Sequence, residues 1–413
     1  MTRPRRPLPG HARHAAPGMK LTPGSWMVFA MAAATGLAVA NLYYAQPLLD
    51  TLARAFTVST GTAGLIVTLT QLGYAVGLAF VVPLGDLLER RRLIIIVTLA
   101  TAAALAMAAW APTIGLFLAA SLLVGVTAVV AQVLVPFAAH LAADHERGRV
   151  VGQIMTGLLL GILLARTVSG AIADLMGWRA VFWLAAVIML LQALMLVRIL
   201  PPGRGDIRLS YPALLVSVLH LLRDEPVLRR RTAYGMMSMA SFSVLWTALP
   251  FLLANAPYGY SDTVIGLFGL VGAAGAACAT FAGHLHDRGG ARTGTGCFLA
   301  LIVAAFALMG LLGSHLVAII AGVLLLDIGA QGTQVLNQSA IYQLRPDARS
   351  RITTAYMTCF FFGGVLGSAG AAYMYGFAGW PGVAWLGGGF GTAGLLMWMT
   401  EAGPPARGRR KDA

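Results

Sequence analysis

The sequence predicts an all-α integral membrane protein with twelve transmembrane helices. Three observations support this prediction: a composition poor in charge, twelve apolar runs, and an internal repeat that divides the runs into two groups of six. Of the 413 residues, 58% are hydrophobic and 11% are charged. The charged fraction is less than half of the roughly 25% typical of a globular domain. This composition places most of the chain in a lipid bilayer and leaves no room for a large soluble domain.

Each apolar run is of a length that can cross the hydrocarbon core as a helix. The runs of the first half are Trp26 to Leu49, Gly61 to Leu84, Leu93 to Ala111, Ile114 to Ala139, Val150 to Ala173 and Ala180 to Leu200. Those of the second half are Thr232 to Leu253, Thr263 to Gly283, Thr295 to Gly313, Leu316 to Tyr342, Thr353 to Tyr375 and Val383 to Met399. We expect one six-helix unit over residues 25–200 and a second over residues 232–400.

Basic residues lie between the runs and set the expected orientation. Of the 29 Lys and Arg residues, all but Arg54, Arg166 and Arg179 fall on one side of the twelve-span topology, which the positive-inside rule assigns to the cytoplasm. That side includes the tails, residues 1–24 and 401–413, and a linker, residues 201–231, with an amphipathic stretch from Tyr211 to Leu222. Topology thus explains the net charge of +14, and we expect no nucleic-acid partner.

An internal repeat at an offset of 202 residues relates the two halves. The segment from Arg147 to Leu184 recurs without a gap from Arg349 to Leu386, with the Gly177-Trp178 pair repeated as Gly379-Trp380. The offset covers six spans, an even number, so both halves enter the membrane in the same direction. This is a parallel repeat about an axis along the membrane normal.

A loop motif points to a family. The sequence Gly283-His-Leu285-His-Asp287-Arg288-Gly-Gly290-Ala-Arg292 resembles the motif G-x-L-x-D-R-x-G-x-[RK] of the major facilitator superfamily, and Leu84-Gly-Asp86-Leu-Leu-Glu-Arg90-Arg91 is a weaker copy. The resemblance implies two six-helix bundles around a central cavity that opens alternately to each side. The run from Asn41 to Pro47, with Asn337-Gln338, is similar to bacterial efflux-type members, including arabinose-efflux permeases and drug:proton antiporters.

The same loops contain candidate gating charges. A carboxylate at a helix end beside arginines forms a charge cluster that can hold one face closed and release it when the bundles move. We expect one such cluster at Asp86, Arg90 and Arg91 and a second at Asp287, Arg288 and Arg292. The alternative is that these charges only anchor the loops in the cytoplasm.

Charges inside the membrane are costly and therefore informative. Arg166 in the fifth span and Asp327 in the tenth lie deep in their runs, and the repeat places Ser368 and Gly125 at the equivalent positions. Each charge is thus present in one half only, as coupling to a proton or a substrate requires. Whether Arg166 and Asp327 pair stays open at this point.

Polar residues of the first, fourth, seventh and tenth spans are candidates for a substrate and proton pathway. Asp327, Gln331, Gln334 and Gln338 occupy one face of the tenth span, with Asn337 beside it and Gln132 at a repeat-related position. The first span contributes Asn41, Tyr43, Tyr44 and Gln46, and the seventh contributes Trp246. Two alternatives remain open: the amides bond neighbouring helices together, and the tyrosines belong to an interfacial aromatic belt.

We therefore expect a secondary transporter of a small organic molecule, working by alternating access, with proton-coupled efflux as the leading hypothesis and uptake symport or facilitated diffusion as the alternative. A membrane sensor or enzyme is a remote alternative, since no paired acid and base or nucleophile motif was found. We expect no cofactor and no metal, because Cys278, Cys297 and Cys359 lack ligand spacing. The expected setting is the inner membrane of a bacterium, as a monomer with both termini in the cytoplasm.

Overall fold

The computed structural model describes residues 25–143, 145–202, 210–272, 290–345 and 348–401, and within these ranges all regular secondary structure is helical. The first half contains α1 (Ser25–Ala40), α2 (Leu49–Ala55), α3 (Thr60–Val76), a π-helix (Gly77–Val81), α4 (Leu84–Leu87), α5 (Arg90–Trp110), α6 (Ile114–Thr127), α7 (Val130–Leu141), α8 (Arg147–Met176) and α9 (Trp178–Ile199). The rest contains α10 (Tyr211–Asp224), α11 (Pro226–Ala254), α12 (Asp262–Val271), α14 (Ala291–Leu311), α15 (Leu316–Tyr342) and α16 (Arg349–Met399).

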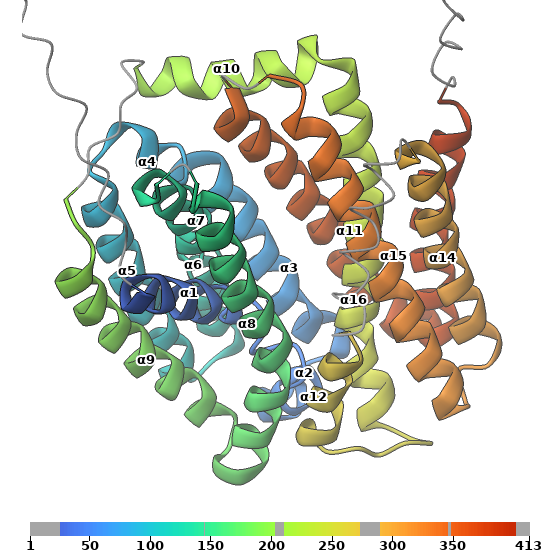
Figure 1. Ribbon diagram of the computed structural model, residues 1–413. Coiled ribbons are helices and arrows are strands. Elements are labelled where there is room, and N and C mark those ends of the chain that lie inside the picture. The colour runs from blue at the N-terminus through green and yellow to red at the C-terminus, as the bar shows by residue number, and fades with distance from the viewer. Residues whose placement is uncertain (1–24, 144, 203–209, 273–289, 346–347, 402–413) are drawn as a thin grey trace, which may run out of the picture.

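The helices form two groups that stand side by side, with α10 crossing one end (Figure 1). We call this end, where α10 lies, the linker end, and the opposite end the far end. Because lipid offers no hydrogen-bond partners, a membrane-spanning backbone must satisfy its own polar groups, which explains the long continuous helices. The predicted all-α membrane fold is confirmed.

Within the described residues, nine helices are long and apolar enough to cross a membrane. They correspond to ten predicted spans, since α16 contains two: Gly379, with a φ of 60°, breaks its helical geometry. A positive φ is accessible to glycine at little cost. The shorter helices α1 and α12 begin the first and eighth spans. The predicted remainder of the eighth span, to Gly283, lies outside the described residues.

The first span differs from the prediction of one continuous helix to Leu49. Helix α1 ends at Ala40, residues 41–48 form turns, and α2 follows. Asn41 closes the end of α1 by donating from Nδ2 to the carbonyls of Leu37 and Ala38, at 3.1 and 3.2 Å. Apolar character alone did not reveal this interruption, which places Tyr43, Tyr44 and Gln46 on non-helical backbone.

The internal repeat corresponds to equivalent helix contacts in the two halves. Gly161 of α8 packs against the backbone of α1 at Gly36, and Gly363 of α16, which is 202 residues later, packs against α11 at Met236. A side chain at either glycine would collide with the neighbouring helix. Small residues therefore allow the first and fifth spans of each half to approach closely.

Candidate functional site

A group of polar and aromatic side chains lies where the two halves meet. It consists of Tyr43, Gln46, Arg166, Trp246 and Asp327, and we call it the central cluster. Its members come from the turns after α1, from α8, from α11 and from α15. Three are contributed by the first half and two by the second, so relative movement of the halves must rearrange the cluster.

Arg166 is held in place by a hydrogen bond and by aromatic rings. Its side chain is buried, and its Nε donates to Oε1 of Gln46 at 2.7 Å. The guanidinium carbon lies 3.9 Å from the centre of the Trp246 ring and 4.7 Å from that of Tyr43. Stacking of this kind stabilises a desolvated cation. One terminal nitrogen, Nη2, is buried without a hydrogen-bond partner.

Asp327 is also buried and incompletely satisfied. The residue is 3% exposed, and its Oδ2 has no hydrogen-bond partner. The charges of Arg166 and Asp327 lie within electrostatic reach of each other, but the two residues form no ion pair. The indole N–H of Trp246 lies near the same carboxyl group, but the two do not form a hydrogen bond. Arg166 and Asp327 thus each have one buried polar atom without a hydrogen-bond partner.

One face of α12 lies against both charges. A Cβ built at Gly269 would stand 3.1 Å from the Cβ of Arg166, and one built at Gly272, directly after the helix, would collide with Oδ2 of Asp327. The two glycines are three residues apart, or about 4.5 Å along a helix axis. They bring α12 against the charged groups of both halves.

The amide face of α15 meets α16. The hydroxyl of Tyr356 donates to Oε1 of Gln334 at 2.6 Å and lies 3.4 Å from Nδ2 of Asn337. Gln338 approaches the sulfur of Met357 at 3.8 Å. These contacts join neighbouring helices of one half, which fits the interhelical alternative for these three amides. Gln331 is half-buried and makes no side-chain hydrogen bond within the part of the chain that the structure describes.

The remaining polar candidates of the first half are buried or bonded to neighbouring helices. Nδ2 of Asn41 also contacts the sulfur of Met189 on α9, at 3.4 Å. Gln132 donates to the hydroxyl of Tyr74 at 3.3 Å. Tyr43 and Tyr44 are 9% and 8% exposed, so neither ring lies on the lipid-facing surface that an aromatic belt requires.

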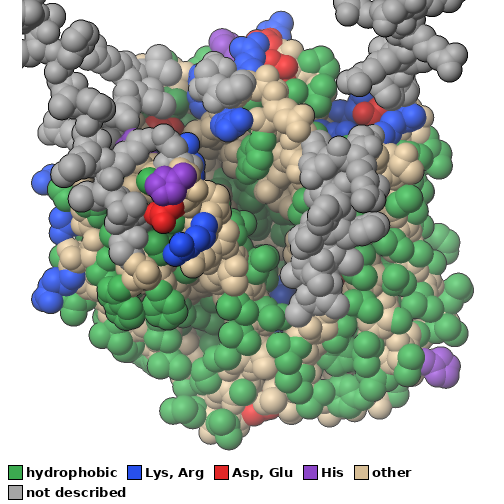
Figure 2. Space-filling model, in the orientation of Figure 1, with side chains coloured by type: hydrophobic (Ala, Val, Ile, Leu, Met, Phe, Trp, Pro, Cys, Tyr) green, Lys and Arg blue, Asp and Glu red, His purple; other side chains and the backbone are tan. Residues whose placement is uncertain are grey.

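At the far end, polar contacts join the two halves. The hydroxyl of Thr51 on α2 donates to the carboxylate of Asp262 on α12 at 2.7 Å, and Asn255 donates to Asp50 at 3.0 Å. The backbone N–H of Thr263 donates to Asp174 of α8 at 2.9 Å. Toward the linker end, the molecule is hollowed between the halves (Figure 2). The structure is therefore closed at the far end.

At the linker end, the predicted gating charges contact different partners and do not all form one cluster. Asp86 lies 3.8 Å from Arg90, and it accepts a hydrogen bond from Ser350 of the other half at 3.2 Å. Arg91 instead donates to the carbonyl of Val197 on α9. Arg292 contacts the backbone carbonyl of Glu401. Asp287 and Arg288 lie outside the described residues.

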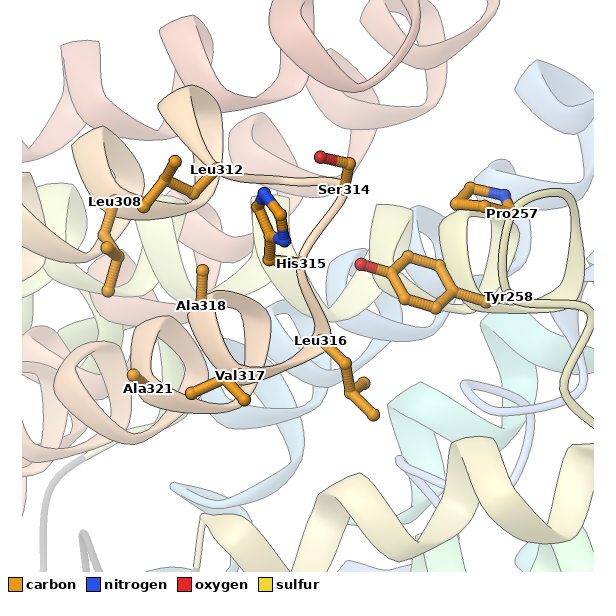
Figure 3. Close-up of a pocket in the computed structure, with 10 residues that line it drawn as sticks. All are labelled: Pro257, Tyr258, Leu308, Leu312, Ser314, His315, Leu316, Val317, Ala318 and Ala321. Atoms are coloured by element: carbon orange, nitrogen blue, oxygen red, sulfur yellow. The ribbon is translucent and has the colours of Figure 1, made fainter.

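A separate surface pocket of about 650 Å³ lies at the far end, between the α11–α12 turn and the α14–α15 turn. Its lining is mostly apolar and includes Tyr258 and His315 (Figure 3). It contains no member of the central cluster and lies within one half. We therefore do not assign it to the path of a transported molecule.

Several residues of the interface were missed by the sequence analysis. Phe242, whose ring centre is 6.0 Å from the Arg166 guanidinium, is one helical turn before Trp246, a spacing that was available as a signal. Nε2 of Gln71 on α3 donates a hydrogen bond to the hydroxyl of Ser243 on α11 at 3.0 Å. This bond joins the two halves one residue after Phe242. Helical periodicity within one span does not identify Gln71 as an interface residue, because its partner Ser243 lies in the other half.

Comparisons with known proteins agree with the architecture. The sequence profile of the Major Facilitator Superfamily matches residues 28–340 and, separately, residues 232–413. The chain is 48% identical over 382 residues to the putative uncharacterized transporter YgaY of Escherichia coli K12, covering 92% of this chain and 96% of that protein. It is 35% identical over 383 residues to the probable transporter SCO4007 of Streptomyces coelicolor, covering 91% of this chain and 87% of that protein.

The fold is also that of solved transporters. The crystal structure of a D-xylose-proton symporter superposes with a TM-score of 0.72 at 17% identity, over 90% of this chain and 97% of that one. Twelve predicted spans, equivalent contacts in both halves and profile matches that together cover residues 28–413 point to one conclusion. The chain belongs to the Major Facilitator Superfamily and is a membrane transporter.

Proposed function

We propose that this transporter exports a small organic molecule in exchange for protons, with Asp327 as the proton-binding group. The observation that carries the proposal is the buried, unpartnered Oδ2 of Asp327 beside a cation from the opposite half. Burial favours the neutral form of a carboxyl group, whereas a nearby guanidinium favours the carboxylate. Movement of the halves changes the balance between these two effects.

Exchange follows from competition for one group. When Asp327 is ionised, Oδ2 accepts a hydrogen bond or faces a cationic group of the transported molecule. When Asp327 is protonated, that attraction is lost and the molecule is released. Entry of a proton on one side and its release on the other then drive export against a gradient. Similarity of the first and tenth spans to efflux-type members supports this direction.

A second candidate function rests on Arg166. Its free Nη2 suits an anionic molecule, which would bind best while Asp327 is neutral. Binding of the anion together with the proton would give symport and uptake. The two functions differ in the sign of the proton movement that accompanies the transported molecule.

The test is a panel of cationic, neutral and anionic organic compounds applied to proteoliposomes that contain a pH-sensitive dye. Export by exchange predicts that an outward gradient of a transported compound draws protons inward. Symport predicts proton movement in the direction of the compound. Compound counterflow without any proton movement would contradict both coupled functions and leave facilitated diffusion.

A further inference from the structure

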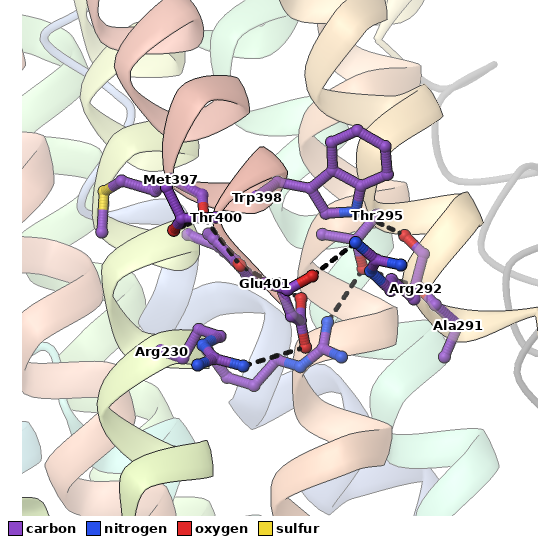
Figure 4. A network of polar contacts seen from close by, with 10 residues as sticks. Arg230, Ala291, Arg292, Thr295, Met397, Trp398, Thr400 and Glu401 are labelled. Carbon is purple, nitrogen blue, oxygen red and sulfur yellow. Dashed lines mark hydrogen bonds and ion pairs between the residues drawn. The ribbon is translucent and has the colours of Figure 1, made fainter. Parts of the chain in front are cut away.

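Three arginines lie around the end of α16 at the linker end of the second half. Arg230 of α11 lies 3.4 Å from Oε1 of Glu401, two residues after the last residue of α16. Arg292 of α14 donates to the backbone carbonyl of Glu401, and its guanidinium lies 5.6 Å from the centre of the Trp398 ring (Figure 4). Arg231 donates to the hydroxyl of Thr295 on α14 at 2.9 Å. We call Arg230, Arg231 and Arg292 the arginine cluster.

The arginine cluster has more charge and more donors than its described neighbours satisfy. Of its three guanidinium groups, only that of Arg230 contacts the Glu401 carboxylate, which also accepts a hydrogen bond from Tyr234 at 3.1 Å. Arg231 is 7% exposed, and the Nε atoms of Arg231 and Arg292 are buried without hydrogen-bond partners. Unsatisfied donors on buried cations are costly, and the oxygens of an anion would satisfy them.

Apolar surface borders the arginine cluster. On the last turn of α16, Leu396 and Met399 are 57% and 58% exposed, and the Nε1 of the adjoining Trp398 donates to the carbonyl of Arg292. Exposed apolar side chains of a membrane-spanning helix face acyl chains. A molecule with a phosphate group above an acyl chain therefore matches both parts of this surface.

We propose that the arginine cluster binds a phosphate-bearing anion, with the headgroup of an anionic phospholipid in the adjoining leaflet as its source. Arg230 is the accessible member, with a side chain 47% exposed, and provides the first contact. Arg231 and Arg292 supply the buried donors. The Glu401 carboxylate competes with the phosphate for the guanidinium of Arg230. The site is distinct from the central cluster and does not depend on the proposed function.

The alternative is that the arginine cluster only fastens the end of α16 through Glu401. The two accounts differ in what they predict for Glu401→Gln. Loss of a fastening carboxylate destabilises the protein and creates no affinity. Loss of a competing carboxylate increases the affinity for an anion. A gain of binding cannot result from misfolding, so this variant remains informative if an arginine variant does not fold.

The experiment measures lipid binding to the purified full chain by native mass spectrometry, with phosphatidylglycerol and, as a neutral control, phosphatidylcholine. We expect Arg230→Gln and Arg292→Gln each to weaken phosphatidylglycerol binding by about fivefold, and Glu401→Gln to strengthen it by a similar factor. Arg345→Gln is the matched control, since Arg345 pairs with Glu225 at 2.8 Å elsewhere at the linker end. It should bind as the wild type does.

A parallel titration with inorganic phosphate identifies the source. Stabilisation of the wild type by phosphate that is lost in Arg230→Gln and increased in Glu401→Gln would support a soluble phosphate ligand in place of the lipid. Equal binding of phosphatidylglycerol by the wild type, Arg230→Gln, Arg292→Gln and Glu401→Gln, together with no response to phosphate, would overturn the proposal.

Discussion

Arg166 lies over the ring of Trp246 and does not form an ion pair with Asp327, although both charges are buried within electrostatic reach of each other. Arg166 belongs to the first half, whereas Trp246 and Asp327 belong to the second. A direct ion pair would hold the two halves together in one arrangement. Stacking on Trp246 instead leaves the Asp327 carboxyl group free to bind a proton or a transported molecule.

The first prediction concerns this stacking. We expect Trp246→Leu to reduce proton-coupled transport by about tenfold, because the guanidinium loses its aromatic partner and is free to pair with Asp327. Trp246→Phe keeps a ring at the site and should retain transport within about threefold. Initial rates in proteoliposomes at equal protein content measure both variants. Equal rates for the leucine and phenylalanine variants would show that the stacking has no role.

A second prediction concerns the glycine that faces Asp327. Gly272→Ala places a Cβ where Oδ2 of Asp327 lies, so the carboxyl group must move. We expect transport to fall at least tenfold while the amount of inserted protein stays near that of the wild type. Gly389→Ala is the control, since a Cβ at Gly389 meets nothing within 4 Å. Similar transport by the two variants would contradict a close approach of α12 to Asp327.

The far-end contacts lead to a third prediction. Thr51→Val removes the hydrogen bond to Asp262 between the halves and should shift the population toward a state open at the far end. Ser59→Ala is a control at the same end, because Ser59 caps only its own helix α3. Distances between spin labels placed on α2 and α12 report the shift. Unchanged distance distributions in Thr51→Val would show that this contact does not hold the far end closed.

A fourth prediction distinguishes the two interpretations of Asp86. If Asp86 holds the halves together through Ser350, Asp86→Ala should lower transport severalfold with normal insertion. Glu89→Gln, which disturbs the pair with the exposed Arg92 within the same half, should transport as the wild type does. Wild-type transport by Asp86→Ala would support the interpretation that this loop charge is only an anchor.

The sequence predicted the helices well because a membrane span is encoded by local composition. The repeat is matched by equivalent contacts in the structure, such as those of Gly161 and Gly363, because the same small residues recur at the same offset. The interruption at residues 41–48 was missed, since these residues remain apolar enough to continue a span. Its physical signs are Asn41, which caps the end of α1, and Pro47, which lacks an N–H group, six residues later.

The candidate site was predicted less completely than the fold. Helical periodicity placed Gln334 and Gln338 on one face of α15 but did not show that this face meets Met357 of α16. The helices are apolar around much of their circumference, so sequence alone does not fix which side faces the other half. For the same reason, the position of Arg166 between Gln46 and Trp246 required the structure.

The most direct test of the central claim, that Asp327 couples transport to protons, is compound transport by Asp327→Asn in proteoliposomes with and without a pH gradient. Ser368→Ala serves as the control, because Ser368 occupies the position equivalent to Arg166 and its hydroxyl bonds only within its own helix. The account predicts that Asp327→Asn keeps compound exchange within about threefold of the wild type. It also predicts that uphill transport and its dependence on pH are lost. Uphill transport by Asp327→Asn at the wild-type rate, with unchanged pH dependence, would contradict the account.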